Sequence, residues 1–135
     1  MFNIVDQDAK YTQQQNALIQ RLSKLDPSLA SAMRVMRSNI HEPISIPVLA
    51  VQVGISQRKL NSIFQTHFGK SPQNIYVEER LMIAQRLVKS SQKTVTDIAF
   101  ACGFSSINSF ARSYKLQFGV SASEQRSAMR FTLVT

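Results

Sequence analysis

The sequence has a single cysteine and only two histidines, and these shortages exclude several kinds of site. Cys102 is the only cysteine, so the chain has no intrachain disulfide and no metal site built from several cysteines. Its position just before Gly103, in an apolar segment, favours a small buried core residue over a nucleophile. His41 and His67 have no partner at metal-ligand spacing. We therefore expect no metal and no cofactor.

Long apolar runs are also missing, and acidic residues are few. No stretch approaches the roughly 20 apolar residues of a membrane span, and the N-terminus lacks the pattern of a secretory signal. We therefore expect a cytoplasmic protein without a membrane partner. The sequence has eight acidic and 16 basic residues, which gives a net charge of +8. Such a surface attracts polyanions, although charge alone leaves nucleic-acid binding and a plain solvated basic surface as alternatives.

The sequence contains one arrangement of apolar residues and glycines that occurs twice, once on each side of a segment that is typical of a long helix. Paired positions lie 49 residues apart up to a glycine and 50 residues apart after it. The pairs are Leu49 and Ile98, Gly54 and Gly103, Leu60 and Phe110, Phe64 and Tyr114, and Gly69 and Gly119. A repeat at this period indicates two copies of one supersecondary unit.

Each copy has the pattern of a helix-turn-helix. A short helix with a small inward alanine is followed by a glycine, which adopts the left-handed turn without steric penalty. A serine then caps the second helix: Ser56 in the first copy, and Ser105 or Ser106 in the second. Apolar residues at four-residue spacing give that second helix one buried stripe.

The remaining segments complete an all-α fold with about seven helices, in which a long central helix joins two helix-turn-helix subdomains. Residues 1–25 are polar and glutamine-rich and are interpreted as a linker or N-terminal extension, in which only Leu18, Ile19, Leu22 and Leu25 indicate a helical face. A larger domain is expected over 26–130. Its first helix begins at Asp26-Pro27, carries an apolar stripe that extends to Ile40, and is ended by Pro43. Its predicted parts are a first helix-turn-helix at 45–69, the central helix at 72–89, a second helix-turn-helix at 94–119 and a last helix at 122–129.

From Ser45 to Arg126 the sequence resembles the DNA-binding domain of the AraC/XylS family of bacterial transcription regulators. The second copy carries most of this resemblance, in Ile98-Ala99, Gly103-Phe104, Ser109-Phe110, Tyr114-Lys115 and Gly119. Three positions depart from the family pattern: Tyr114 stands where phenylalanine is commoner, Ala122 where proline is usual, and Gln125 where an aromatic residue is usual. Ser121 and Glu124 still form a capping box for the last helix.

The resemblance implies double-stranded DNA and RNA polymerase as partners, with a small-molecule effector acting only through a sensor domain absent from this chain. Residues 1–25 are too short to be that sensor. The chain is therefore either a stand-alone regulator or a fragment of a longer one. The run from Asp26-Pro27 to Glu42-Pro43 resembles the domain start in members with an amidotransferase-like sensor, which favours a fragment.

The second helix of each copy is the predicted recognition helix, which lies in the major groove. Burial of the apolar stripe turns the other side of each helix outward. The resemblance places the base contacts on that side, at Arg58, Asn61 and Ser62 in the first copy and Ile107, Asn108 and Arg112 in the second. The chemistry is suitable, because arginine binds guanine and asparagine binds adenine through paired hydrogen bonds.

Other polar residues are better placed for DNA phosphates than for bases, and such contacts position a protein without specifying sequence. The predicted phosphate contacts are Gln57, Lys59, Gln65, Lys70, Lys93, Ser105, Ser106 and Lys115. Arg80 is excluded from this set. Its inward neighbours predict a structural ion pair, for which Asp97 is a candidate partner.

The sequence thus predicts a sequence-specific, double-stranded DNA-binding transcription regulator that uses two recognition helices in successive major grooves. An enzyme is not expected, because the chain has no phosphate-binding glycine loop, no HExxH motif and no plausible catalytic triad. The alternative is a non-enzymatic module that uses the same fold for protein contacts or for non-specific nucleic-acid binding.

Overall fold

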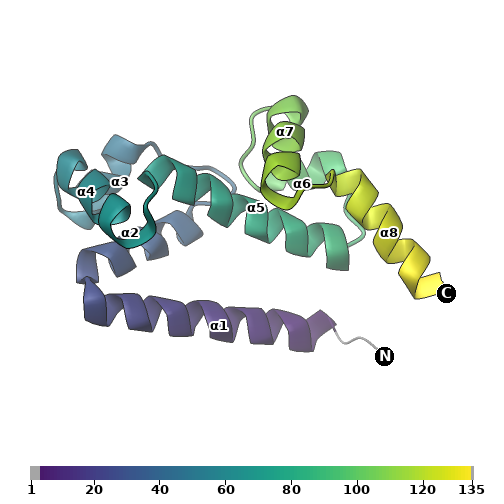
Figure 1. The fold of residues 1–135 in the computed structure, drawn as a ribbon, viewed down its shortest axis with the longest axis horizontal. Helices are drawn as coiled ribbons and strands as arrows, with labels where there is room; N and C mark the ends of the chain where they lie inside the picture. The colour runs from purple at the N-terminus through teal and green to yellow at the C-terminus, as the bar shows by residue number, and fades with distance from the viewer. Residues whose placement is uncertain (1–3, 135) are drawn as a thin grey trace. The chain divides into compact units, whose positions relative to one another are not determined.

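The computed structural model describes residues 4–134, and that part of the chain is all-helical, as predicted. Eight helices are present in the described range, against about seven expected. They are α1 (Ile4–Leu25), α2 (Pro27–Ser38), α3 (Ile46–Val53), α4 (Gln57–Phe68), α5 (Pro72–Ser90), α6 (Val95–Ala101), α7 (Ile107–Phe118) and α8 (Ala122–Val134) (Figure 1).

The chain forms two compact units, which are described separately. Unit 1 consists of the residues up to Ser38 together with Ile44–Gln73, and unit 2 of Asn39–Pro43 together with the residues from Asn74 onward. Each unit contains one complete helix-turn-helix, α3–α4 in unit 1 and α6–α7 in unit 2.

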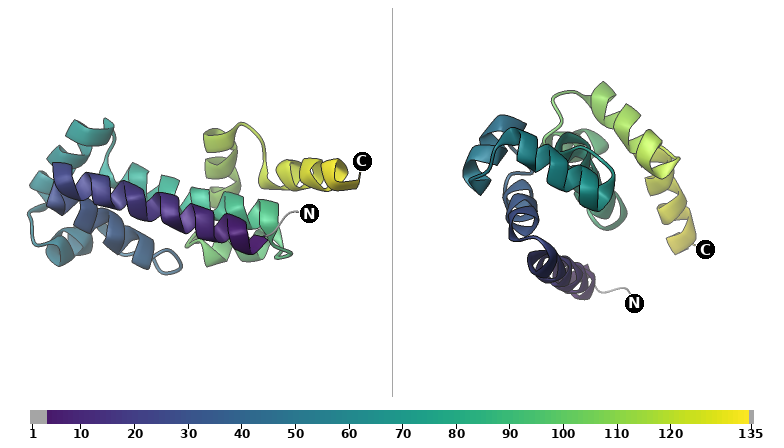
Figure 2. Two further views of the ribbon diagram at one scale, coloured as in Figure 1. Left: turned by 90° about the horizontal axis from the view of Figure 1, so that it is seen from below. Right: turned by 60° about the vertical axis from the view of Figure 1, so that its left-hand side comes forward.

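The additional helix is α1, which occupies most of the segment interpreted as a linker or extension, residues 1–3 of which lie outside the described range. Figure 2 shows α1 lying alongside α2, and the two helices are in contact. Leu22 is buried, and Leu18 and Ile19 are partly buried. These residues belong to the helical face that the sequence indicates in this segment, and one narrow apolar stripe suffices to attach a surface helix.

The helix α2 begins as expected but ends earlier than Pro43. Asp26 caps it, since its carboxylate accepts hydrogen bonds from the backbone N–H groups of Ser28 at 3.0 Å and Leu29 at 3.4 Å. The helix stops at Ser38 because the following segment, Asn39–Pro43, packs in unit 2. There the Tyr76 hydroxyl donates to the Asn39 carbonyl at 2.5 Å.

The two glycine turns have the predicted left-handed conformation, at φ 85° for Gly54 and 84° for Gly103. Their surroundings differ. A Cβ atom at position 54 would meet nothing within 4 Å, whereas one at position 103 would lie 2.3 Å from the Ile40 carbonyl oxygen and 2.5 Å from Cγ of Pro43. The segment Asn39–Pro43 therefore packs directly on the second turn.

Arg80 holds that turn from the other side. It is only 8% exposed, donates to the Gly103 carbonyl oxygen at 2.9 Å, and lies 4.7 Å from the centre of the Phe104 ring and 5.5 Å from that of Tyr76. Burial lowers the pKa of its guanidinium. The structural role expected for Arg80 is correct, but a backbone carbonyl and two aromatic rings provide the contacts in place of a carboxylate.

The core of unit 2 forms where α5, α6, α7 and α8 meet. Phe104, Phe110, Tyr114 and Phe118 follow one another in tilted or edge-to-face ring contacts, with centroids 4.6–5.5 Å apart. Cys102 is fully buried beside them, as expected, and burial raises the pKa of its thiol to about 11, so the thiol stays protonated at neutral pH.

Two polar contacts fasten α8 within this unit. The buried Tyr114 hydroxyl donates to the side-chain oxygen of Gln125. The Arg126 guanidinium donates to the carbonyl oxygens of Leu87 and Val88 at 3.2 Å, Ser91 at 3.3 Å, and Lys93. Arg126 thereby satisfies carbonyls at the C-terminal end of α5, where a helix leaves its last carbonyls unpaired.

Within the described residues, no helix combines the length and the apolar character that a membrane crossing requires.

Candidate nucleic-acid interface

The helix α4 begins at a serine cap and turns one polar side toward solvent. Ser56 accepts a hydrogen bond from the Lys59 backbone N–H at 3.1 Å, as predicted. Leu60, Ile63 and Phe64 are buried and fix the rotation of the helix about its axis. Positions 58, 61, 62 and 65 share the opposite side, at the spacing that places residues on one helical face.

The helix α7 has the same design. Of the two serines left open by the sequence, Ser106 is the cap, because its side chain accepts from the Ser109 backbone N–H at 3.1 Å. Phe110 and Tyr114 are buried, and positions 108, 111, 112 and 115 share the opposite side. We call the outward sides of α4 and α7 the two recognition faces.

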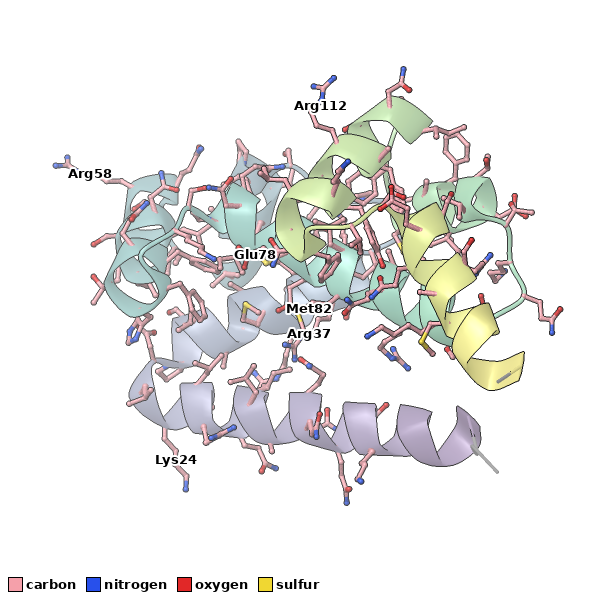
Figure 3. The ribbon with its side chains drawn as sticks, turned by 45° about the vertical axis from the view of Figure 1, so that its right-hand side comes forward. Lys24, Arg37, Arg58, Glu78, Met82 and Arg112 are labelled. Atoms are coloured by element: carbon pink, nitrogen blue, oxygen red, sulfur yellow. The ribbon has the colours of Figure 1, made fainter. Side chains whose placement is uncertain are left out.

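All six predicted base-contacting residues are exposed, five of them on these faces and Ile107 at the first position of α7. They are Arg58, Asn61 and Ser62 on α4, and Ile107, Asn108 and Arg112 on α7. Figure 3 shows Arg58 extending away from unit 1 and Arg112 away from unit 2. Among the described residues neither arginine has an ion-pair partner, so both guanidinium groups are available to a ligand.

The predicted phosphate-contacting residues are exposed too, in three settings. Gln57, Lys59 and Gln65 lie on α4, and Ser105, Ser106 and Lys115 lie at the start of α7 or along it. Lys70 lies between α4 and α5, and Lys93 between α5 and α6. Lys93 is therefore on neither recognition face, and its carbonyl accepts from Arg126.

Arg126 was not among the residues predicted to matter, although it supports the unit that carries α7. Its partners belong to the end of α5 and the loop after it, more than 30 residues earlier in the chain. A basic residue is a common partner for helix-terminal carbonyls, but only the folded chain reveals which helix end it reaches.

Nothing in the described part of the chain suggests a metal centre, since no three His, Cys, Asp or Glu side chains converge there.

Comparison with known proteins identifies the motif. Residues 49–128 match the family model described as a helix-turn-helix domain. The chain is 34% identical over 110 residues to the HTH-type transcriptional regulator ArgR of Pseudomonas aeruginosa, an alignment that covers 82% of this chain and 33% of the relative. It is 34% identical over 100 residues to the regulator GbdR of the same species, covering 74% of this chain and 27% of the relative. The match thus spans between about a quarter and a third of the length of these relatives.

Solved structures agree with this assignment. A transcriptional regulator described as having an AraC-type DNA-binding domain, from Chromobacterium violaceum, is 34% identical, with a TM-score of 0.76, and the match covers 79% of this chain and 96% of that one. The DNA-binding domain of AdpA, solved in complex with a target DNA, is 28% identical, with a TM-score of 0.73, and the match covers 77% of this chain and 94% of that one. The chain belongs to the AraC/XylS family of helix-turn-helix transcription regulators.

Proposed function

We propose that residues 26–130 bind double-stranded DNA in a sequence-specific manner and place α4 and α7 in successive major grooves. The observation that carries this proposal is the pair of recognition faces: two capped helices that bury matching apolar stripes and leave polar side chains with hydrogen-bonding groups exposed. The AdpA domain, a neighbour of the same fold, was solved on DNA, which supports the same use of these helices.

The proposal divides the exposed residues by role. Arg58, Asn61 and Ser62, with Ile107, Asn108 and Arg112, contact base edges. The lysines and the polar residues at the helix starts contact phosphates: Gln57, Lys59, Gln65, Lys70, Lys93, Ser105, Ser106 and Lys115. The backbone N–H groups at the starts of both helices add to these phosphate contacts, because a helix N-terminus attracts anions.

The wider role follows from the family. The chain would regulate transcription through contact with RNA polymerase, without catalytic activity of its own, in the cytoplasm. In a protein as long as the relatives, a small-molecule effector would act through a sensor domain outside the 135 residues of this chain.

Selection from random DNA duplexes tests the proposal. We expect one enriched motif, bound at least about a thousandfold more tightly than unrelated duplexes. Binding that depends on salt but not on sequence would contradict it, because phosphate contacts alone give that behaviour.

Two substitutions on α7 then separate base contacts from phosphate contacts. Arg112→Ala should weaken binding to the selected site by about 1 to 3 kcal/mol and relax the preference at one base pair. Lys115→Ala should weaken binding to all duplexes alike and lower the salt dependence by about one unit. An Arg112→Ala protein with unchanged base preference would remove Arg112 from the base-contacting set.

A further inference from the structure

An open surface hollow of about 480 Å³, which we call the cavity, lies in unit 1 where α1 and α2 meet, and its lining contains no residue of the helix-turn-helix. One stripe of α1 supplies most of its wall, because Ala17, Gln20, Arg21 and Lys24 recur at the spacing of one helical face. Ser23 of α1 and Arg34 of α2 complete it. Three of the six lining side chains are therefore cationic, and they come from two helices.

Among the side chains that the structure describes in unit 1, no carboxylate neutralises these three cations. Asp26 is the only carboxylate among them, and it caps α2 and lies 4.0 Å from His67.

The three cations also have no structural task that explains them. Arg21, Lys24 and Arg34 are all exposed, and none makes a hydrogen bond or ion pair with the described residues. Arg37, one turn beyond Arg34 on α2, differs because it donates to the Gln15 carbonyl oxygen at 3.3 Å and so fastens the two helices. Three like charges around one hollow repel one another, and a bound anion would relieve that repulsion.

The cavity does not belong to the recognition face of the same unit. In Figure 3, Lys24 on α1 and Arg58 on α4 lie on different sides of unit 1. A ligand at the cavity therefore does not compete with α4 for its DNA segment.

We propose that this cavity binds an anion that carries two or more linked phosphate groups. Two guanidinium groups match phosphate oxygens through paired hydrogen bonds, while Lys24 adds a point charge. Gln20 and Ser23 add neutral donors between these charges. The volume lies in the range of small-ligand sites, which run from about 300 to 1,000 Å³.

Titration with inorganic triphosphate tests the site in the whole chain at about 0.15 M salt. We expect saturable binding with one triphosphate per chain. The double variant Arg21→Gln/Arg34→Gln should bind at least about tenfold more weakly, because it removes both guanidinium groups. Lys10→Gln removes one exposed charge from α1 outside the cavity and should leave the affinity within about twofold.

Two results would overturn the proposal: binding that does not saturate, or an equal loss in the double variant and in Lys10→Gln. Either would mean that triphosphate only screens the net charge. Thermal unfolding of each variant should match the parent, since all the substituted side chains are exposed, and this excludes misfolding as the cause of a loss.

The same variants identify the source of the phosphate groups. If the double variant binds a selected duplex as tightly as the parent does, the ligand of the cavity is a free oligophosphate. Duplex affinity that falls in the double variant but not in Lys10→Gln indicates the backbone of a second nucleic-acid segment. The triphosphate titration itself does not depend on base recognition by α4 and α7, so this test and that of the proposed function fail separately.

Discussion

The two helix-turn-helix motifs have the same backbone design but differ in how much the rest of the chain depends on each. Both turns contain a glycine at positive φ, and both recognition helices begin at a serine cap. The first turn is open, whereas the second is packed between Asn39–Pro43 and Arg80. The same sequence pattern thus forms a turn without close neighbours at Gly54 and a turn packed against other segments at Gly103.

The repeat extends beyond the two motifs. Tyr76 and Arg126 are 50 residues apart, as are the paired residues of the recognition helices, and each donates to backbone carbonyls at or just after the end of an earlier helix. Tyr76 donates to Asn39, the residue after α2, while Arg126 donates around the end of α5. The same position therefore does the same task with a neutral hydroxyl in one copy and a cation in the other.

The recognition faces differ most in chemistry. Positions 50 residues apart pair Arg58 with Asn108 and Ser62 with Arg112, so the arginine lies near the start of α4 but about one turn further along α7. The two recognition helices therefore share a backbone design but carry different side chains. We expect them to bind two different half-sites, so that the DNA site is not a palindrome.

Alanine at the two turn glycines should give the largest difference between the motifs. Gly103→Ala should destabilise the protein by roughly 2 to 6 kcal/mol, because backbone strain adds to a clash with the Ile40 carbonyl and the Pro43 ring. Gly54→Ala is the matched control and should cost roughly 1 to 2 kcal/mol from strain alone. Denaturant unfolding measures both, and equal losses would mean that Asn39–Pro43 does not pack on the second turn.

Removal of the two helix-end donors should give the next largest effect. Arg126→Leu should cost about 2 kcal/mol, because it takes a charged donor from the carbonyls around the end of α5. Tyr76→Phe removes one neutral donor and should cost about 1 kcal/mol. Lys89→Gln, an exposed cation in the last turn of α5, is the control and should change stability by less than about 0.5 kcal/mol. If the Lys89 variant lost as much stability as the Arg126 variant, the loss would come from removing a charge near the helix end. The hydrogen bonds of Arg126 would then not be its cause.

The polar contact between Tyr114 and Gln125 should give the smallest effect. Tyr114→Phe leaves the Gln125 oxygen without its donor and should cost about 1 kcal/mol. In the first copy, Phe64 and Ile75 occupy the paired positions, so Tyr114→Phe/Gln125→Ile imitates that copy and should recover most of the loss. A double-mutant cycle measures the coupling, and additive losses would contradict it.

Alkaline titration checks the same contact. Burial raises the pKa of Tyr114 from 10.0 to about 12, so the folded protein favours the neutral phenol. The resulting stability is complete below pH 10 and is lost as the pH rises from 10 to about 12. Tyr114→Phe should lose less stability than the parent over that interval.

Patterns among residues close together in the chain made much of this structure predictable from the sequence. Ser56 and Ser121 cap helices as expected, and Ser45 and Thr94 follow the same rule, because capping needs only residues three apart. The early end of α2 and the role of Arg126 were not predictable, since both depend on contacts between segments distant in sequence. The helix α1 was predicted only in part, as a helical face at its C-terminal end, because the glutamine-rich residues before that face carry no apolar stripe.

The departures from the family pattern near the C-terminus also find a partial explanation. Tyr114 and Gln125 differ from the usual residues together, and in the structure they are hydrogen-bonded to each other. Either change alone would bury an unpaired polar group or lose a partner, so the two are best understood as one substitution. Ala122 is buried at the first position of α8, where the Ser121 and Glu124 capping box replaces the conformational help of a proline.

DNA footprinting of the parent beside Arg58→Ala and Arg112→Ala tests the central claim, that one chain uses two recognition helices. The helix α5, which joins the motifs along the chain, has 19 residues and spans roughly 28 Å, close to the approximately 34 Å of one DNA turn. We expect one chain per asymmetric site, protection of two successive major-groove segments, and loss of base preference in a different segment for each variant. Protection of a single segment, or loss in the same segment for both variants, would contradict the account.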